Sequence, residues 1–226
     1  MGILYIIGTP IGNLGDITYR AVETLKTVGV IACEDTRRTV KLLNHFGIHA
    51  PLVSCRAGNE KRAAQKIIAR LNEGENAAYA SDAGTPALSD PGAALARLAS
   101  QAGHMVIPIP GASAFAALVS AACACDKTII FEGFLSPKAG RRRSRLKALL
   151  DTGAAFVLYE SPFRILKVLE DLVEFDRERY VCVGREMTKL HEEYLRGSAA
   201  EILTELAEKN EQIGEFSVFV SGNKAG

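Results

Sequence analysis

Three loops rich in glycine and proline are the parts of this sequence whose residue types best suit ligand chemistry. They run from Gly8 to Asn13, from Ser81 to Gly92 and from Pro108 to Ala114. Each follows an apolar run, so each is expected to leave the carboxyl end of a buried strand, where open α/β sheets bind ligands. Backbone amides in such loops can approach and hold an anionic group. Taken alone, each loop has the alternative of a tight turn between a strand and a helix.

The second loop contains more small and turn-forming residues than a simple connection requires. Asp90 and Pro91 suit the N-cap and the first position of the following helix, so that end of the loop is predicted to be structural. Asp82 and Gly84 have no such structural role in the sequence pattern, which favours a functional one. The first loop is not the G-x-G-x-x-G pattern of dinucleotide-binding proteins.

A dense run of positive charge lies in the second half of the chain. It contains six cations within ten residues and meets no acid before Asp151: Lys138, Arg141, Arg142, Arg143, Arg145 and Lys147. The alternative is a solvated helix face. Because the run is unbalanced and follows a predicted strand end at Gly133 and Phe134, contact with phosphates is favoured.

The elements that must position these residues alternate between strand and helix. Apolar strands separated by amphipathic helices predict a parallel sheet covered on both faces. The expected strands are Ile3 to Ile7, Val30 to Cys33, Pro51 to Ser54, Asn76 to Ala80, Met105 to Ile109, Thr128 to Phe134, Phe156 to Tyr159, Tyr180 to Val183, a hairpin-like strand near Tyr194, and Phe216 to Val220. Asp16 is expected to cap the first helix, and Gly47 to end the second.

The residue composition of the sequence changes after Pro110, and this change predicts two lobes. A small-residue helix from Ala112 to Ala124 begins the second part. We place the boundary between residues 112 and 113, giving an N-terminal α/β lobe (1–112) and a C-terminal α/β lobe (113–226). The first lobe carries the glycine-rich loops and the second carries the basic helix.

Bulk properties indicate a cytoplasmic enzyme. A length of 226 residues with 48% hydrophobic content is enough for a sizeable core. The net charge of +1 gives no global attraction to nucleic acid or membranes. We expect no membrane span and no signal peptide, and the five cysteines, including Cys123 and Cys125, suggest reduced, mostly buried thiols. No metal site is predicted, because Gly47 separates His45 from His49 and Cys123-x-Cys125 lies at the end of an apolar helix.

Six motifs in register make the resemblance to a known family specific. They are Gly8-Thr9-Pro10-Ile11-Gly12-Asn13-Leu14, Glu34-Asp35-Thr36-Arg37, Ser81-Asp82-Ala83-Gly84-Thr85-Pro86 with Ser89-Asp90-Pro91-Gly92, Pro110-Gly111, Tyr159-Glu160-Ser161-Pro162, and Arg185-Glu186-Met187-Thr188-Lys189. Over essentially its whole length the chain resembles the bacterial small-subunit ribosomal RNA (cytidine-2′-O)-methyltransferases of the tetrapyrrole methylase superfamily.

This resemblance implies two αβα lobes with mostly parallel sheets, S-adenosylmethionine in the cleft between the lobes, and a homodimer. By motif, the expected cofactor-binding residues are Pro10, Asp82, Ala83, Gly84, Ala87, Ser113, Ala114, Glu160 and Met187. Small side chains and backbone amides suit the methionine carboxylate of the cofactor, and carboxylates tolerate its positive sulfonium.

Methyl transfer to a ribose hydroxyl requires alignment of oxygen and methyl, and a group that takes the hydroxyl proton. Carboxylates near the expected site are Glu34, Asp35, Asp82 and Glu160, and no single one is assigned as the base. The alternative for Asp35 is to cap the helix that follows it. If Asp35 is the base, Asp35→Asn would abolish turnover and leave cofactor affinity intact.

The acceptor implied by the resemblance is small-subunit ribosomal RNA or the assembled subunit. The predicted RNA-binding residues are Lys138, Arg141, Arg142, Arg143 and Arg145, with Arg37, Arg38 and Lys41 as a second patch. Arg142→Glu is accordingly expected to raise the KM for RNA. Two alternatives stay open at this point. One is methylation of a tetrapyrrole or other small acceptor by the same fold, and the other is a non-catalytic RNA-binding or assembly module.

Overall fold

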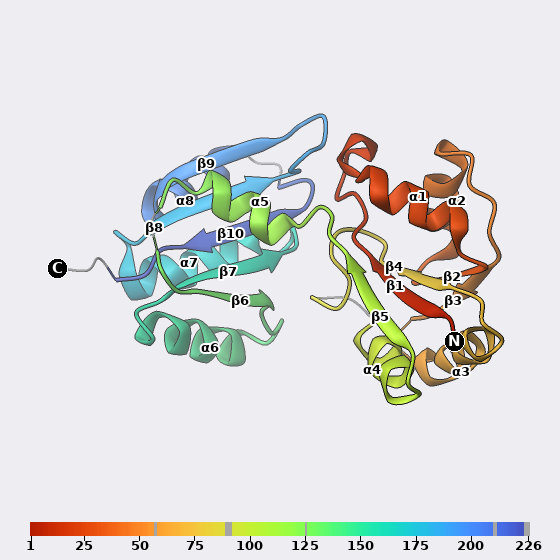
Figure 1. Cartoon of the computed structure of the whole chain (residues 1–226). Helices are drawn as coiled ribbons and strands as arrows, with labels where there is room; N and C mark the ends of the chain where they lie inside the picture. The colour runs from red at the N-terminus through yellow and green to blue at the C-terminus, as the bar shows by residue number, and fades with distance from the viewer. Residues whose placement is uncertain (57, 89–91, 125, 210–211, 224–226) are drawn as a thin grey trace. The chain divides into compact units, whose positions relative to one another are not determined.

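The chain folds into two units in the computed structural model, which describes residues 1–56, 58–88, 92–124, 126–209 and 212–223. Unit 1 comprises residues Met1–Ser113 and unit 2 comprises Ala114–Gly226 (Figure 1). Each unit contains its own sheet and its own hydrophobic core.

Unit 1 is built on a parallel sheet whose strand order places the first strand near the middle. The order is β3-β2-β4-β1-β5, and each neighbouring pair runs parallel. The strands are β1 (Ile3–Ile7), β2 (Val30–Cys33), β3 (Leu52–Ser54), β4 (Ala77–Ala80) and β5 (Met105–Ile109). Their nearly uninterrupted apolar sequences reflect burial on both faces, as predicted for a parallel sheet.

Helices cover both faces of this sheet (Figure 1). Helices α1 (Tyr19–Thr27) and α2 (Thr36–His45) pack on one face, through residues such as Leu25 and Leu43. Helices α3 (Glu60–Asn72) and α4 (Ala93–Gln101) pack on the other, through residues such as Ile67 and Leu95. The connection from β1 therefore goes to one face and the connection from β4 to the other.

The predicted helix ends of unit 1 have mixed outcomes. Asp16 was expected to cap the first helix, and this is wrong. Asp16 ends a short 3₁₀ helix, η1 (Leu14–Asp16), and the Thr18 side chain caps α1 by accepting from the Ala21 N–H. Gly47 follows α2 with a φ of +63°, as expected for a residue that ends a helix. The predicted cap at Asp90 and Pro91 lies outside the described residues.

Unit 2 contains a mixed sheet of order β6-β7-β10-β8-β9. Its strands are β6 (Ile129–Phe134), β7 (Ala155–Glu160), β8 (Tyr180–Arg185), β9 (Glu193–Ser198) and β10 (Phe216–Val220). Strands β6, β7 and β8 share one direction, while β9 and β10 run against them. This sheet is less parallel than expected because β9 returns directly beside β8, and β10 inserts between β7 and β8.

The helices of unit 2 divide unequally between the faces of its sheet. Helix α5 (Ala114–Ala121) packs on one face, where Leu118 belongs to a buried cluster with Val157, Cys182 and Phe219. Helices α6 (Ala139–Asp151), α7 (Ile165–Asp176) and α8 (Ala199–Glu208) cover the opposite face. A capping box at Ser198 and Glu201 starts α8.

Three of the four described cysteines are buried, as the sequence predicts. Cys33, Cys55 and Cys182 are buried free thiols and Cys123 is an exposed one, whereas Cys125 lies outside the described residues. Among the helices that the structure describes, none combines the length and the apolar character that crossing a membrane requires.

Candidate functional site

The three glycine-rich loops of the sequence leave adjacent strands of unit 1. Strand β1 lies between β4 and β5, so the loops that follow these strands share one edge of the sheet. The chain leaves β1 toward the face of α1 and leaves β4 toward the face of α4. Adjacent strands with connections to opposite faces open a crevice at their carboxyl ends, which is where this class of fold binds ligands.

Backbone hydrogen bonds join the loop after β1 to the loop after β4. The Thr9 N–H donates to the Gly84 carbonyl at 2.9 Å, and the Gly84 N–H donates to the Thr9 carbonyl at 3.0 Å. The buried Ser81 hydroxyl also donates to the Gly84 carbonyl, at 2.9 Å. Gly84 has a φ of +77°, a conformation that residues with a side chain rarely adopt. These contacts fix the path of the glycine loop.

The loop after β5 approaches the loop after β1 just as closely. A Cβ atom on Gly8 would lie 2.7 Å from the Gly111 nitrogen, and one on Gly111 would lie 2.6 Å from the Gly8 oxygen. Both positions therefore require glycine. The Thr85 hydroxyl donates to the Ala112 carbonyl at 3.2 Å, which ties the loop after β4 to the loop after β5. All three loops form one backbone-lined surface at the sheet edge.

The predicted cofactor residues of unit 1 lie on these loops: Pro10, Asp82, Ala83, Gly84, Ala87 and Ser113. Ala83 and Ala87 are exposed, and Gly84 is buried. Ala87 has a φ of +66°, a strained value for a residue with a Cβ atom. Strained backbone of this kind concentrates at ligand sites, where the surrounding structure holds it in place.

Asp82 connects the glycine loop to the start of α2. One of its oxygens, Oδ1, accepts from the Asp35 N–H at 2.9 Å, and Oδ2 lies 3.6 Å from Nε of Arg38. Strands β2 and β4 are neighbours, so this contact bridges the loops at their carboxyl ends. It brings the second motif of the sequence, Glu34 to Arg37, to the edge that carries the glycine loops.

Asp35 takes the capping role that was weighed against a catalytic one. Its Oδ1 accepts from the Arg37 N–H at 2.9 Å, which caps α2, and its Oδ2 pairs with Arg37 Nη2 at 2.7 Å. Hydrogen bonds from the side chain and the backbone N–H of Arg37 hold the pKa of Asp35 well below its usual range. A carboxylate with a depressed pKa is a weak proton acceptor. Glu34, half-buried at the end of β2, precedes it.

Glu160 ends β7 in unit 2 and is 3% exposed. Its Oε1 accepts from the Ser161 N–H at 2.7 Å and pairs with Arg164 Nη2 at 2.6 Å. Its Oε2 is buried and has no hydrogen-bond partner within the described part of the chain. A buried carboxylate oxygen without a donor is energetically costly, so this atom is suited to a group that a ligand supplies.

Met187 lies in a strained turn after β8. Its neighbours Glu186 and Thr188 have φ values of +49° and +66°. The Met187 side chain is buried against α5, and a Cβ on Gly184 would lie 2.6 Å from its sulfur atom. Thr188 Oγ1 is buried and, among the residues that the structure describes, has no hydrogen-bond partner. Ala114, the other predicted cofactor residue of unit 2, begins α5 and packs on the same cluster.

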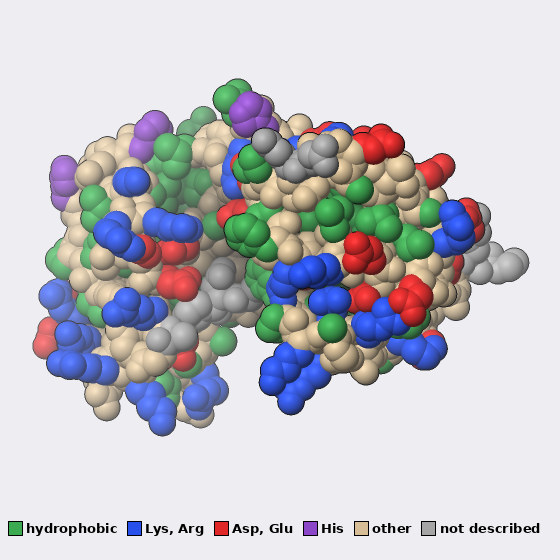
Figure 2. Space-filling model, turned by 180° about the vertical axis from the view of Figure 1, so that it is seen from behind, with side chains coloured by type: hydrophobic (Ala, Val, Ile, Leu, Met, Phe, Trp, Pro, Cys, Tyr) green, Lys and Arg blue, Asp and Glu red, His purple; other side chains and the backbone are tan. Residues whose placement is uncertain are grey.

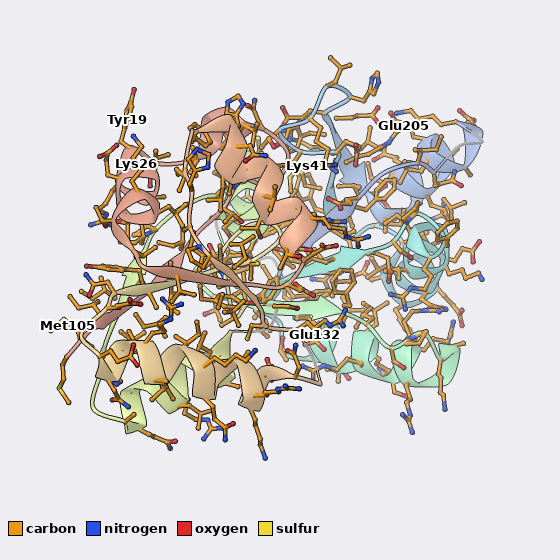
Figure 3. The ribbon with its side chains drawn as sticks, turned by 90° about the vertical axis from the view of Figure 1, so that its right-hand side faces the viewer. Tyr19, Lys26, Lys41, Met105, Glu132 and Glu205 are labelled. Atoms are coloured by element: carbon orange, nitrogen blue, oxygen red, sulfur yellow. The ribbon has the colours of Figure 1, made fainter. Side chains whose placement is uncertain are left out.

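The basic run on α6 differs from the sequence-based expectation. Arg142 was predicted to bind RNA, and this is wrong because it is buried and pairs through Nε with Asp171 of α7 at 2.7 Å. Arg143 bridges Asp171 and Glu174, and Arg145 pairs with Glu132 of β6 at 2.6 Å. Figure 2 shows basic and acidic side chains interspersed over the α6 and α7 face, and Figure 3 labels Glu132. Tertiary contacts supply the acids that the local sequence lacks.

Five further predicted RNA contacts have exposed side chains, and of these Arg37 is firmly paired with an acid. Lys138 and Arg141 are exposed, and no ion pair involves either of them across residues 1–56, 58–88, 92–124, 126–209 and 212–223. In unit 1, the side chain of Arg37 is 87% exposed although paired with Asp35, and that of Arg38 is 66% exposed. Lys41, labelled in Figure 3, is exposed on α2.

Two features of the site were not identified from the sequence. The Thr9 and Ser81 hydroxyls, buried beside the Gly84 carbonyl, hold the loops together. The Tyr159 hydroxyl accepts from the Phe115 N–H at 3.0 Å and so anchors the start of α5. Thr9 and Tyr159 lie inside recognised motifs, but their partners are 44 to 75 residues away, and local sequence gives no signal of such a contact.

Comparisons with known proteins agree on one family. The model of the tetrapyrrole (corrin/porphyrin) methylases matches residues 3–203. The chain is 48% identical over 224 residues to a ribosomal RNA small subunit methyltransferase I of Synechocystis, covering 98% of this chain and 80% of that one. It is 45% identical over 220 residues to the protein of that name from Borrelia garinii, covering 97% and 98%. The equivalent from Thermotoga maritima is 44% identical over 224 residues, covering 99% and 100%.

Solved structures share the fold at low sequence identity. A cobalt precorrin-4 methyltransferase aligns with a TM-score of 0.71 at 18% identity, covering 97% of this chain and 94% of that one. The methyltransferase CobJ aligns with a TM-score of 0.71 at 19% identity, covering 98% and 95%. These likenesses establish the arrangement of elements.

Proposed function

Since the chain belongs to the tetrapyrrole methylase family, we propose that it transfers a methyl group from S-adenosylmethionine to small-subunit ribosomal RNA. The acceptor in this proposal is the 2′-hydroxyl of a cytidine ribose. The observation that carries the proposal is the backbone-lined surface at the carboxyl ends of β4, β1 and β5, in a chain whose relatives at 44 to 48% identity are named as methyltransferases of this RNA.

The residues present fit S-adenosylmethionine, the cofactor of this family. Glycine at positions 8, 84 and 111 lets the three loops approach one another closely, and backbone groups of such loops suit the amino acid end of the cofactor. Glu160 Oε2, which has no hydrogen-bond partner among the residues described, offers negative charge to a cationic ligand. The residues that the family resemblance assigns to the cofactor are Pro10, Asp82, Ala83, Gly84, Ala87, Ser113, Ala114, Glu160 and Met187. When bound, the cofactor supplies a methyl group activated by a positive sulfonium.

The work left to the protein is to position the acceptor hydroxyl and to remove its proton. Positioning of this kind contributes about 7–11 kcal/mol in well-oriented systems, and a general base contributes about 10²–10⁴-fold in rate. Among the proposed bases, Asp35 has both oxygens engaged by Arg37. Glu160 has a buried oxygen with no partner in the described residues, so we assign proton removal to Glu160 first and to Asp35 second.

The direct test incubates the protein with S-adenosylmethionine labelled in its methyl group and with small ribosomal subunits that lack the modification. The RNA is then digested to nucleosides. Label in 2′-O-methylcytidine is the expected result. Label in another nucleoside would contradict the choice of acceptor, and absence of label from RNA, with cofactor binding measured separately, would contradict the RNA methyltransferase itself.

A matched pair of variants controls this assay. Gly84→Val places a side chain against Ile11 at a left-handed backbone position, so binding of the labelled cofactor should fall at least tenfold. Met105→Ala removes an exposed side chain at the amino end of β5, labelled in Figure 3, and should leave both binding and transfer unchanged. Equal activity of the two variants would exclude the glycine loop from the site.

Two further assignments follow from the same resemblance. We propose a homodimer, to be measured by light scattering of the purified chain, where a monomer at micromolar concentration would contradict it. We also propose that the enzyme works in the cytoplasm, because its acceptor is part of the ribosome. Fractionation of cells that produce the tagged protein tests this assignment.

A further inference from the structure

Two aromatic side chains stand exposed on neighbouring loops of unit 2. Phe134 ends β6 and is 59% exposed, and Phe163 lies in the loop after β7 and is 88% exposed. Strands β6 and β7 are parallel neighbours, so both side chains lie at the same edge of the sheet. Exposure of two large rings on adjacent loops is unfavourable for folding alone, which points to a binding role.

Contacts within unit 2 hold these two loops together. Arg164, next to Phe163, donates from Nη1 to the carbonyl of Leu135, next to Phe134, at 3.2 Å. The same guanidinium pairs through Nη2 with Glu160 at 2.6 Å. The Phe134 ring packs edge-on against Tyr159, with ring centroids 5.8 Å apart. Tyr159 therefore supports the Phe134 ring, and the loop of Phe163 is joined through Arg164 to the buried carboxylate assigned to proton removal.

Positive charge without an acidic partner lies beside the aromatic pair. Lys138 and Arg141 follow Phe134 at the start of α6, and both are exposed and outside every ion pair of the described chain. The first backbone amides of α6 have no side-chain cap. The other arginines of this run, Arg142, Arg143 and Arg145, are neutralised by acids of α7 and β6. The unpaired cations of this run, within the described residues, are thus the two that follow Phe134 most closely in the chain.

We infer that Phe134 and Phe163 form a stacking platform for unstacked bases of single-stranded RNA, and that Lys138 and Arg141 contact the adjoining phosphates. RNA whose bases are splayed out is bound by aromatic stacking together with basic side chains. A flat ring offers a base its whole face, and the two cations match the charge of the backbone. The platform rests on the proposed function, and it names the residues that present RNA next to Glu160.

The test measures binding of a short fluorescein-labelled single-stranded RNA by fluorescence anisotropy at several salt concentrations. Phe134→Leu and Phe163→Leu keep the apolar volume but remove the ring, and each should weaken binding at least fivefold, or about 1 kcal/mol. Phe163→Tyr keeps the ring and should bind as the wild type does. A duplex of the same sequence, whose bases are already stacked, should show little difference among these proteins.

The salt dependence separates stacking from charge. Lys138→Gln and Arg141→Gln should each reduce the slope of log K against log salt by about 0.7, the value for one phosphate contact on a single strand. The leucine variants should leave that slope unchanged. Cofactor affinity and melting temperature of every variant serve as checks on folding, and Met105→Ala provides the exposed apolar control.

Two outcomes would overturn the platform and leave the enzyme assignment standing. In both, the wild type methylates unmodified small subunits. In one, the leucine variants bind single-stranded RNA as tightly as the wild type does. In the other, Phe163→Tyr weakens RNA binding as much as Phe163→Leu does. Because tyrosine keeps the ring, this result would show that the binding does not depend on stacking. A wild-type chain that neither binds nor methylates RNA would overturn both proposals together.

Discussion

At the scale of single residues, the site separates carboxylates that are engaged from one that is not. Asp35 caps α2 and pairs with Arg37, and Asp82 accepts from the Asp35 N–H. These contacts give both side chains a structural role in unit 1. Glu160 differs because only one of its oxygens has partners in the described chain, and the other is buried without one. Burial of an unsatisfied acceptor is unfavourable, so we expect a bound ligand to donate to this oxygen.

Glu160→Gln tests the catalytic role at this scale. The amide keeps the shape and can still accept from Ser161, but it cannot take a proton. We expect kcat for methyl transfer to fall by about 10²-fold or more, and the Kd for S-adenosylmethionine to rise as well, because the amide no longer offers negative charge to the cofactor. Equilibrium binding and single-turnover transfer measure the two quantities. A large loss of cofactor affinity with kcat retained would make Glu160 a cofactor contact only.

Asp35→Asn is the companion variant, because asparagine also caps helices well. If Asp35 is the base, this variant loses turnover and Glu160→Gln does not, which reverses the assignment.

At the scale of elements, α6 carries many cationic side chains, but few of them are both exposed and free of an acidic partner in the described chain. One face of α6 packs on the core through Leu146 and Leu149, and this places Arg142 toward α7. There the guanidinium meets Asp171, and both side chains are 7% exposed. A buried ion pair of this kind tolerates loss of one partner poorly, because the remaining charge is left without compensation.

Adjacent arginines on α6 should therefore respond in different ways to the same substitution. Arg142→Glu is expected to lower the free energy of unfolding by about 3 kcal/mol or more, because it sets two buried carboxylates against each other. Arg141→Glu should leave stability within about 0.5 kcal/mol and weaken RNA binding. Urea unfolding and anisotropy measure the two effects. Equal stability of the two variants would contradict burial of Arg142.

At the scale of the whole molecule, carboxylates in both units are stabilised in their charged form. Hydrogen bonds from Arg143 lower the pKa of Glu174, and hydrogen bonds from Lys209 lower that of Glu193. Arg37 does the same for Asp35 in unit 1. In the unfolded chain these groups return to their ordinary pKa of about 4. Folding therefore favours the ionised carboxylates over the protonated ones.

Stability should accordingly fall in acid. The contribution of a carboxylate whose folded pKa is lowered is present above its unfolded pKa and is lost as the pH falls through the folded value. We expect the free energy of unfolding to be level from about pH 7 to 5 and to decrease steadily below about pH 4. Urea unfolding at fixed salt measures this profile. Constant stability from pH 5 to 3 would show that these ion pairs contribute nothing, as exposed pairs sometimes do.

The sequence by itself determined the alternation of strands and helices and the loops that carry the site. Short apolar runs mark most of the strands, such as Ile3–Ile7 and Val30–Cys33, and glycine marks the places where backbones approach, as at Gly8 and Gly111. These features are local, because burial on both faces and the absence of a side chain act on a few consecutive residues. Each family motif also consists of a few consecutive residues, so the motifs could be identified without a structure.

Only the tertiary structure decided which polar groups are engaged. The acids that neutralise Arg142, Arg143 and Arg145 lie 13 to 31 residues away, and the Thr9 hydroxyl meets Ser81 at a separation of 72 residues. The reversed direction of β10 was equally hidden, because strand direction depends on how the chain returns to the sheet, whereas β9 was predicted as a hairpin-like strand. Coulomb attraction and hydrogen bonding act through space, so the charge of a segment is settled by its neighbours in the fold and not by its neighbours in the chain.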